Sequence, residues 1–249
     1  MPTTIGLLGT GRLGSAIRDA AASQDAVSVA WAVGRGTLPE GAEAAVDVAI
    51  DVSTAAAVAD HLAWAERTGT PLVIGTTGWD PALLREDVSV PVLVAPNFSL
   101  GVALVRRLAR VLGGYAASAP LDVDLAVTDI HHRHKVDAPS GTALTLREAL
   151  AEGAGVGADA VQTTSLRVGG VVGEHEVVAA SPLETITLRH AAHDRSLFAT
   201  GALTAAQWLV GRPAGVHTLD DLAEEQLRAL LGPTTPQTTP AAPAAGSAA

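Results

Sequence analysis

Apolar and polar positions in the first hundred residues alternate between short hydrophobic runs and amphipathic stretches. The hydrophobic runs predict strands and lie at 4–8, 27–33, 46–52, 72–74 and 90–94. Helical spacing follows the first run, and Ser53 or Thr54 is placed to cap an alanine-rich helix after the third. Strands that alternate with helices form parallel sheets, so this part predicts an N-terminal Rossmann-type α/β domain.

The pattern changes after residue 99. Ser99 is placed to cap a long amphipathic helix that Gly113 and Gly114 would end, and a strand over 123–127 ends at Asp129. A helix then follows, and after it three hydrophobic runs come in succession. The helix covers 140–152, and the three runs lie at 163–168, 174–180 and 184–191. Strands in succession predict a second α+β domain with a mixed or antiparallel sheet.

The C-terminal part returns to helical spacing at 196–210 and 219–231, and we expect both helices to pack back on the first domain. From Gly232 onward the chain has no charge and no periodicity. The predicted organisation is a first domain over 1–99, completed by 196–231, a second domain over 100–195, and a disordered tail over 232–249.

The composition narrows the class of protein. The 249 residues are 48% hydrophobic and 17% charged, which is the balance of a folded globular chain. The net charge of −10 argues against nucleic acid as a partner, because phosphate binding needs a basic face. No cysteine is present, which excludes thiol catalysis and fits a reducing compartment. Without a signal peptide pattern or an apolar run of about 18 residues, we expect a cytoplasmic protein with no membrane partner.

A glycine-rich turn, Gly9-Thr10-Gly11-Arg12-Leu13-Gly14, follows the first predicted strand. In such a turn the first glycine permits a tight bend, the second lets the backbone approach a pyrophosphate, and the third lets helix and strand pack closely. Because a strand precedes it and a helix follows it, we interpret it as a dinucleotide-binding turn. A glycine turn without a ligand is the alternative.

The end of the second predicted strand bears on the choice of cofactor. An NAD-specific fold usually has a carboxylate there to bind the ribose 2′-hydroxyl, but none lies between Ala26 and Pro39. Arg35, together with Arg12, could instead meet a 2′-phosphate, which favours NADPH. The alternative for Arg35 is an exposed arginine in a loop.

Two later loops follow the carboxyl ends of predicted strands, where open parallel sheets bind ligands. The first is Gly75-Thr76-Thr77, and the second is Ala95-Pro96-Asn97-Phe98. We interpret them as the floor and wall of a nicotinamide site. Ordinary turns are the alternative.

The densest polar cluster of the chain lies between Asp129 and Thr142. It contains His131, His132 and Lys135, and it ends in Ser140-Gly141-Thr142, which opens a predicted helix. A helix N-terminus offers unpaired N–H groups, so this cluster can hold a small dianion. Lys135 can donate a proton to a nitrogen of the substrate, and either histidine can bind or protonate a second position.

A metal site is the rival interpretation of this cluster. Its potential ligands are His131, His132, His134 and Asp137. Arg133 and Lys135 lie among them and would repel a divalent ion, so we expect no metal. A surface or capping role is the further alternative for each histidine taken alone.

The run His131 to Ala143, with the sequence HHRHKVDAPSGTA, resembles the signature of the 4-hydroxy-tetrahydrodipicolinate reductase family. The resemblance extends to 9–14, 75–78, 95–99, 172–175 and 198–202. It implies an oxidoreductase of the diaminopimelate route to lysine. Such an enzyme reduces a cyclic imine dicarboxylate, 4-hydroxy-tetrahydrodipicolinate, to tetrahydrodipicolinate with NADPH or NADH and loss of water. It also implies a homotetramer assembled through the sheet of the second domain.

The resemblance also implies roles for single residues. His131 would be the catalytic histidine and Lys135 the proton donor. The residues expected to bind the substrate carboxylates are His132, Ser140, Gly141 and Thr142. Those expected to contact the cofactor, by the resemblance or by the patterns above, are Gly9, Thr10, Gly11, Arg12, Leu13, Gly14, Arg35, Gly75, Thr76, Thr77, Ala95, Pro96, Asn97 and Phe98.

The sequence departs from the family pattern at two places. Asp129 stands where the family commonly has Glu, and Val33, Gly34 and Arg35 replace acidic and basic residues after the second strand. Two other functions remain open. One is another two-domain NAD(P)-dependent amino-acid dehydrogenase, and the other is a regulatory nucleotide-binding protein without catalysis.

Overall fold

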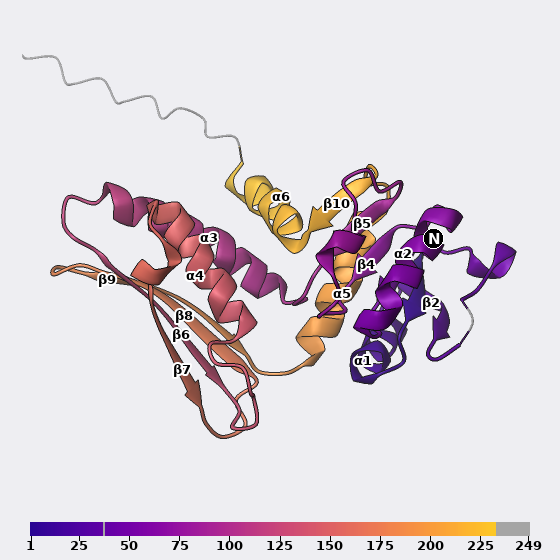
Figure 1. Cartoon of the computed structure of the whole chain (residues 1–249), viewed down its shortest axis with the longest axis horizontal. Coiled ribbons are helices and arrows are strands. Elements are labelled where there is room, and N and C mark those ends of the chain that lie inside the picture. Colours follow the sequence, from indigo (N-terminus) through magenta and orange to yellow (C-terminus); the bar gives the residue numbers. More distant parts are fainter. Residues whose placement is uncertain (37, 233–249) are drawn as a thin grey trace, which may run out of the picture.

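The computed structural model describes residues 1–36 and 38–232 of the chain. It contains two sheets, each with its own helices, which lie side by side in Figure 1. The predicted tail over 232–249 lies outside the described residues except for Gly232. In the described part of the chain, no helix is both long enough and apolar enough to cross a membrane.

The first sheet has six parallel strands in the order β10-β5-β4-β3-β1-β2. These are β1 (Thr3–Leu8), β2 (Val27–Val33), β3 (Val48–Asp51), β4 (Leu72–Ile74), β5 (Pro91–Val94) and β10 (Gly215–Thr218). The order of the strands reverses between β1 and β3. A reversal of this kind opens a crevice at the carboxyl ends of the strands, which is where such sheets bind ligands.

Helices cover both faces of this sheet. One face packs on α1 (Arg12–Ala22), α5 (Ser196–Leu209) and α6 (Leu219–Leu231), with Ile5, Ile50 and Leu203 fully buried between the layers. The other face packs on α2 (Val58–Thr68), whose Trp64 is fully buried. Burial on both faces explains why β4 and the first three residues of β3 are apolar. The predicted Rossmann-type sheet is confirmed, and α5 and α6 pack on it as predicted.

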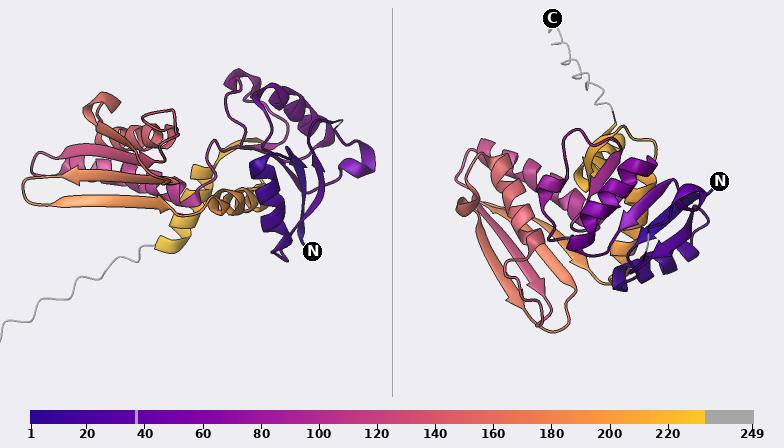
Figure 2. Two further views of the ribbon diagram at one scale, coloured as in Figure 1. Left: turned by 90° about the horizontal axis from the view of Figure 1, so that it is seen from below. Right: turned by 45° about the vertical axis from the view of Figure 1, so that its right-hand side comes forward.

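The second sheet has four strands in the order β7-β6-β8-β9, of which β6 and β7 are parallel and the other pairs antiparallel. They are β6 (Asp124–His131), β7 (Gln162–Arg167), β8 (Gly173–Ala180) and β9 (Thr185–Ala192). The helices α3 (Leu100–Ser118) and α4 (Gly141–Ala154) pack on one face of this sheet (Figure 2). Val127, Leu146 and Val177 are buried between these helices and the sheet. The predicted mixed sheet is confirmed.

The remaining elements are short 3₁₀ turns. They are η1 (Gly41–Ala44), η2 (Ala55–Ala57), η3 (Pro81–Leu83) and η4 (Ala158–Ala160). Asp80 caps η3, because its carboxylate accepts a hydrogen bond from the N–H of Ala82 at 3.0 Å.

Several details of the sequence prediction were wrong. α3 continues through Gly113 and Gly114 to Ser118. The reason is a close crossing with α4, because a Cβ atom on Gly113 would meet the carbonyl oxygen of Leu150. The glycine marks a helix contact and not a helix end.

Two further corrections concern the edges of elements. The side chain of Thr54 makes no capping bond, and the hydroxyl of Ser53 donates instead to Asp51 at 2.6 Å. β6 runs past Asp129 to His131, so the catalytic candidate lies on a strand and not in the loop after it. β10 was not predicted, because it has only four residues and alternates between half-buried and exposed positions at the sheet edge.

Candidate active site

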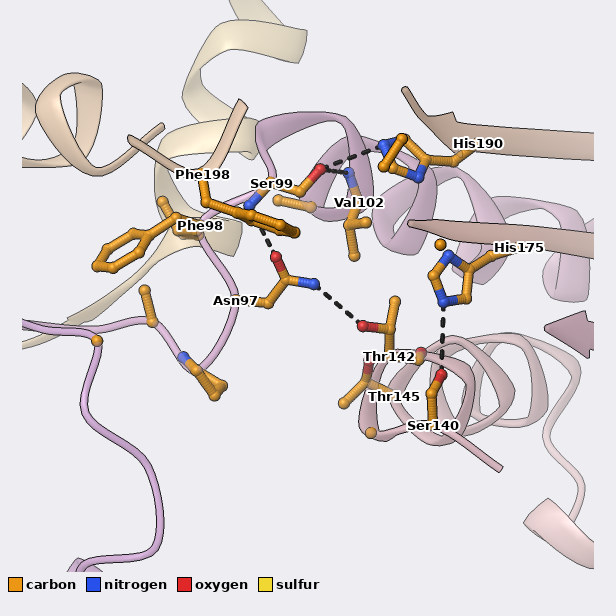
Figure 3. Close-up of a pocket in the computed structure, with 18 of the residues that line it drawn as sticks. Asn97, Phe98, Ser99, Val102, Ser140, Thr142, Thr145, His175, His190 and Phe198 are labelled. Carbon is orange, nitrogen blue, oxygen red and sulfur yellow. Dashed lines mark hydrogen bonds between the residues drawn. The ribbon is translucent and has the colours of Figure 1, made fainter. Parts of the chain in front are cut away.

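A cavity of about 1060 Å³ is lined by residues of both domains. The parallel sheet contributes the loops after β4 and β5, and the mixed sheet contributes β6, β8, β9 and the start of α4. Figure 3 shows Asn97 pointing to Thr142, and Ser99 pointing to His190, at this cavity. The predicted nicotinamide loops and the predicted anion-binding cluster therefore meet in one cavity.

The glycine turn after β1 has the geometry that its sequence predicts. Gly9 has a φ of 120°, and a Cβ atom on Gly14 would collide with the carbonyl oxygen of Gly9. At Gly11 no atom lies within 4 Å of the place that a Cβ atom would take. The backbone at Gly11 is therefore open to a large anion, and Leu13 beside it lines the cavity. This turn fits the pyrophosphate of a dinucleotide.

Arg12 and Arg35 are both exposed, and neither lines the cavity. Arg12 opens α1 directly after β1, and Arg35 follows β2, which pairs with β1 in parallel. The two arginines therefore lie at the same edge of the sheet as the glycine turn, as does Thr10. This edge has arginines where an NAD-specific fold has a carboxylate.

The loops after β4 and β5 form one wall of the cavity. The predicted cofactor residues that line it here are Gly75, Thr77, Ala95, Pro96, Asn97 and Phe98. The ring of Phe98 occupies the space beside Gly75, so that a larger residue there would displace it. Thr76 is different, because its hydroxyl donates to Asp51 at 2.8 Å and accepts from the N–H of Ser53 at 2.9 Å. Its side chain fixes the loop and does not face the cavity.

Asp51, at the end of β3, was missed by the sequence analysis. It is fully buried and lies 2.9 Å from Nδ1 of His61. Burial alone would raise the pKa of Asp51, but the hydrogen bonds from His61, Ser53 and Thr76 together hold it below its usual value. The ionised carboxylate therefore ties the loops after β3 and β4 together.

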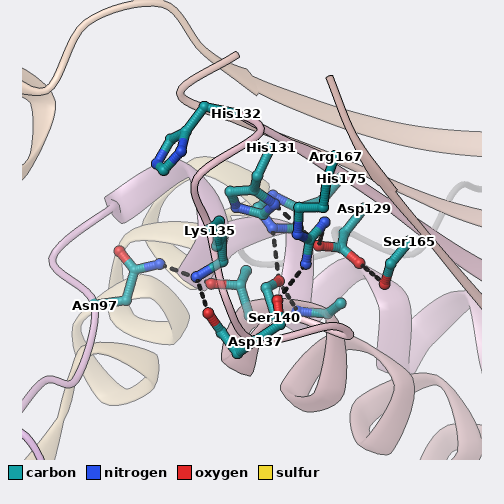
Figure 4. A network of polar contacts seen from close by, with 12 residues as sticks. Asn97, Asp129, His131, His132, Lys135, Asp137, Ser140, Ser165, Arg167 and His175 are labelled. Atoms are coloured by element: carbon teal, nitrogen blue, oxygen red, sulfur yellow. Dashed lines mark hydrogen bonds and ion pairs between the residues drawn. The ribbon is translucent and has the colours of Figure 1, made fainter. Parts of the chain in front are cut away.

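His131 is held by a buried carboxylate, as Figure 4 shows. Nδ1 of His131 lies 2.9 Å from Oδ2 of Asp129, two residues earlier on the same face of β6. The neighbouring strand β7 adds Ser165, which donates to Asp129, and Arg167, whose Nη1 donates to Oδ2 of Asp129 at 3.1 Å. Strand register explains the assembly, since Asp129 pairs with Ser165 and His131 with Arg167.

This network determines the charge states of Asp129 and His131. Burial alone would raise the pKa of Asp129, but the bond from Ser165 and the charge of Arg167 lower it overall. Burial is also the main cause that lowers the pKa of His131, and Lys135 and Arg167 add to the effect while Asp129 opposes it. A neutral His131 then donates its Nδ1 proton to Asp129, and its Nε2 atom is ready to accept a proton.

The loop after β6 places a cation at the cavity. Nζ of Lys135 lies 2.8 Å from Oδ1 of Asp137, and both residues line the cavity. His132 lines it too, with Nε2 at 3.5 Å from Nη2 of Arg195. His134 is exposed and lies outside the cavity lining. The potential metal ligands of this cluster therefore do not converge, and residues 1–36 and 38–232 contain no cluster suited to a metal ion.

The start of α4 lies at the same cavity. The hydroxyl of Ser140 caps the helix by accepting from the N–H of Ala143 at 3.1 Å. Gly141 and Thr142 begin the helix, and all three residues line the cavity. Thr142 accepts a hydrogen bond from Nδ2 of Asn97 at 3.0 Å, which links this helix to the loop after β5.

Two cavity histidines, His175 of β8 and His190 of β9, were not singled out from the sequence. The ring centre of His175 lies 5.1 Å from that of His131 and 6.2 Å from that of His190. Burial is the main cause that lowers the pKa of His175 to about 4, and charge on the other two histidines would act in the same direction. The alternation of buried positions along β8 could have placed His175 on the inner face, but not beside His131.

A parallel sheet with a glycine turn, facing an acid–base site across one cavity, defines a two-domain oxidoreductase that uses a nicotinamide dinucleotide. Two family models match the chain: "Dihydrodipicolinate reductase, N-terminus" over residues 3–98 and "Dihydrodipicolinate reductase, C-terminus" over residues 99–223. The chain belongs to the dihydrodipicolinate reductase family, which confirms the resemblance seen in its sequence.

Individual relatives agree with the family models. The 4-hydroxy-tetrahydrodipicolinate reductase of Gluconobacter oxydans is 46% identical over 70% of this chain and 76% of its own length. The reductase of the same name from Zymomonas mobilis is 40% identical over 88% of this chain and 96% of its own length. As a member of this family, the chain is an NAD(P)H-dependent oxidoreductase.

A solved structure agrees with the fold. The dipicolinate-bound dihydrodipicolinate reductase from Paenisporosarcina sp. TG-14 superposes with a TM-score of 0.76 at 21% identity. The match covers 89% of this chain and 100% of that one. At 21% identity, this match shows that the two proteins share a fold.

Proposed function

We propose that this chain reduces 4-hydroxy-tetrahydrodipicolinate to tetrahydrodipicolinate in the diaminopimelate route to lysine. The reaction takes up a hydride and a proton and releases water. The observation that carries the proposal is the shared cavity, in which the loops after β4 and β5 face His131, Lys135 and the start of α4. Family membership supports the same activity. The alternative of another amino-acid dehydrogenase has no support among these relatives.

The nicotinamide dinucleotide supplies the hydride when it is bound. The glycine turn would hold its pyrophosphate, because Gly11 leaves the backbone open and the N-terminus of α1 offers N–H groups. The loops Gly75–Thr77 and Ala95–Phe98 would hold the nicotinamide end at the cavity. Arg35 and Arg12 favour NADPH over NADH, since both are exposed at the adjoining edge of the sheet.

The substrate carries two carboxylates, and the second domain offers matching donors. Lys135 would be the proton donor and His131 the catalytic histidine, whose Nε2 atom can exchange a proton. His132 and the start of α4, from Ser140 to Thr142, would bind the carboxylates through side chains and backbone N–H groups. Dianion binding also fits the cation of Lys135 at the cavity wall.

We further propose the organisation of the whole enzyme. Residues 1–99, completed by 196–231, would bind the dinucleotide, and residues 100–195 would bind the substrate and form the oligomer. On β7, exposed positions alternate along the strand and include Leu166, which is 49% exposed. An apolar side chain on an open sheet supports assembly into a homotetramer through the mixed sheet. We propose that the enzyme acts in the cytoplasm, without a nucleic-acid or membrane partner.

The test of the activity is oxidation of the reduced nicotinamide, followed by its near-ultraviolet absorbance, with the product of dihydrodipicolinate synthase as substrate. NADH and NADPH are supplied in separate reactions. We expect turnover that depends on the synthase product and a higher kcat/KM with NADPH. The absence of turnover with both cofactors would refute the proposed function. Equal kcat/KM values would refute the preference alone.

A further inference from the structure

Two helices at the cavity, α3 and α4, each start from a serine that faces a histidine of the mixed sheet (Figure 3). At α4, Oγ of Ser140 lies 3.4 Å from Nε2 of His175. At α3, Oγ of Ser99 lies 3.2 Å from Nε2 of His190. The same pairing therefore occurs twice, on the two neighbouring strands β8 and β9.

The hydroxyl of Ser140 already makes two hydrogen bonds within the protein. A hydroxyl can accept two hydrogen bonds and donate one. Oγ of Ser140 already accepts from the N–H of Ala143 at 3.1 Å. If His175 donates to it as well, both lone pairs are occupied and only the hydroxyl proton remains for another partner. If Nε2 of His175 accepts instead, the hydroxyl proton of Ser140 is used in that bond and is not available to a ligand.

The other ring nitrogen of His175 decides between these cases. His175 is only 4% exposed, and its Nδ1 atom is buried without a hydrogen-bond partner in the described residues. A buried N–H group without an acceptor is rare in proteins, whereas a lone pair without a donor is better tolerated. The neutral ring therefore carries its proton on Nε2, where it meets Ser140.

The surroundings of His175 keep this ring neutral. The groups that face it are His131, His190, Lys135 and Asp129. Burial is the main cause that lowers the pKa of His175 to about 4; charge on His131 or His190 and the charge of Lys135 act in the same direction, while Asp129 opposes them. A charged ring would donate from both nitrogens and leave a buried donor on Nδ1 without an acceptor.

We infer that His175 is a positioning residue that, by donating from Nε2 to Ser140, reserves the serine hydroxyl proton for a carboxylate oxygen of the substrate. The inference rests on the proposed function, since it assigns a partner to the dianion. The cavity lining includes Ser140 and His175 together with Lys135, so the hydroxyl can reach an anion held there. The pair His190 and Ser99 repeats the arrangement at α3.

The tautomer is tested directly by nitrogen NMR of the wild-type chain labelled with ¹⁵N-histidine, because the two ring nitrogens have different shifts in each tautomer. At neutral pH we expect His175 in the form protonated on Nε2. The signal is assigned by its loss in His175→Leu. A ring protonated on Nδ1 would overturn the inference, and this result does not depend on which reaction the enzyme performs.

Ligand affinity tests the consequence, with dipicolinate as the probe and calorimetry as the readout. His175→Leu, which lacks the donor, should weaken dipicolinate binding by about three- to tenfold, the effect of one hydrogen bond. His175→Gln keeps an N–H donor near the Nε2 position and should bind within about twofold of the wild type. The affinity for NADPH should be unchanged in both variants.

A double-mutant cycle separates positioning from packing. Ser140→Ala should weaken dipicolinate binding at least as much as His175→Leu, and the double variant should be no weaker than Ser140→Ala alone. Additive effects, or wild-type affinity in His175→Leu, would overturn the inference. Failure of the wild-type chain to bind dipicolinate would overturn the proposed function as well, which distinguishes the two failures.

Discussion

Asp129 controls both the orientation and the charge of His131. Its two oxygens contact His131, Ser165 and Arg167, so that no oxygen is left without a partner. The hydrogen bond from Ser165 and the charge of Arg167 lower the pKa of Asp129 and keep its carboxylate ionised, and the carboxylate fixes the His131 proton on Nδ1. These contacts show that the side chain of Asp129 is long enough to reach His131, Ser165 and Arg167.

Buried His175 makes the stability of the fold sensitive to acid. A histidine titrates near pH 6.5 when unfolded, whereas burial holds the pKa of His175 at about 4 in the fold. Between these values the unfolded chain binds more protons, so stability is lost as the pH falls. From about pH 7 to about pH 5, the wild type should lose roughly 2 kcal/mol of unfolding free energy relative to His175→Gln. Urea denaturation of both proteins at each pH measures this, and parallel losses would contradict it.

At the scale of residues, the sequence identified residues that line the cavity but not the residues that support them. His131, Lys135 and Ser140 stand in one continuous polar cluster, and all three line the cavity. Ser165 and Arg167 could not be found, because their role depends on the pairing of β7 with β6. No pattern within either strand reveals that register.

At the scale of elements, the crossing of α3 and α4 depends on glycine. A Cβ atom on Gly113 would meet the carbonyl oxygen of Leu150, and one on Gly153 would meet the carbonyl oxygen of Arg110. Both obstacles are backbone atoms, which cannot rotate away. The two helices therefore lie closer together than alanine would permit, and α4 is held where its first turn reaches the cavity.

Gly153→Ala should destabilise the fold by about 1–3 kcal/mol, because the clash with Arg110 outweighs the better helix propensity of alanine. Gly157→Ala is the matched control. Gly157 has a φ of −69° and open space around its Cβ position, so alanine there should be neutral or slightly stabilising. Thermal or urea unfolding of both variants measures the difference. Equal stability of the two would show that the crossing tolerates a methyl group.

The same crossing explains what the sequence could not predict about the elements. Gly113 and Gly114 carry the usual signal of a helix end, and only the neighbouring helix shows why the chain continues to Ser118. The sequence did not predict β10, for a different reason. Its four residues join the edge of a sheet whose nearest strand, β5, lies more than a hundred positions earlier in the chain.

At the scale of the whole molecule, α3 joins the two domains. Its residues Arg106 and Arg107 form ion pairs with α6, where Nη1 of Arg106 lies 3.1 Å from Oδ2 of Asp220 and Arg107 contacts Glu224. Asn97 and Thr142 add a hydrogen bond across the cavity. The sequence predicted both sheets but not these contacts, since they join residues that no local pattern connects.

This arrangement separates the two halves of the chemistry. The dinucleotide would be held by loops of the parallel sheet, and Lys135, the proposed proton donor, lies on the loop after β6. A substitution in the loop after β6 should therefore leave the affinity for the dinucleotide unchanged. The separation distinguishes a catalytic role of Lys135 from a role in holding the cofactor.

The most direct test is the kinetics of Lys135→Ala with the cyclic imine, beside the dissociation constant for NADPH. We expect kcat to fall by roughly 10²- to 10⁴-fold, the usual contribution of a positioned proton donor, while NADPH binding stays within about twofold. Wild-type turnover in this variant would contradict the account. So would a loss of cofactor affinity as large as the loss of rate.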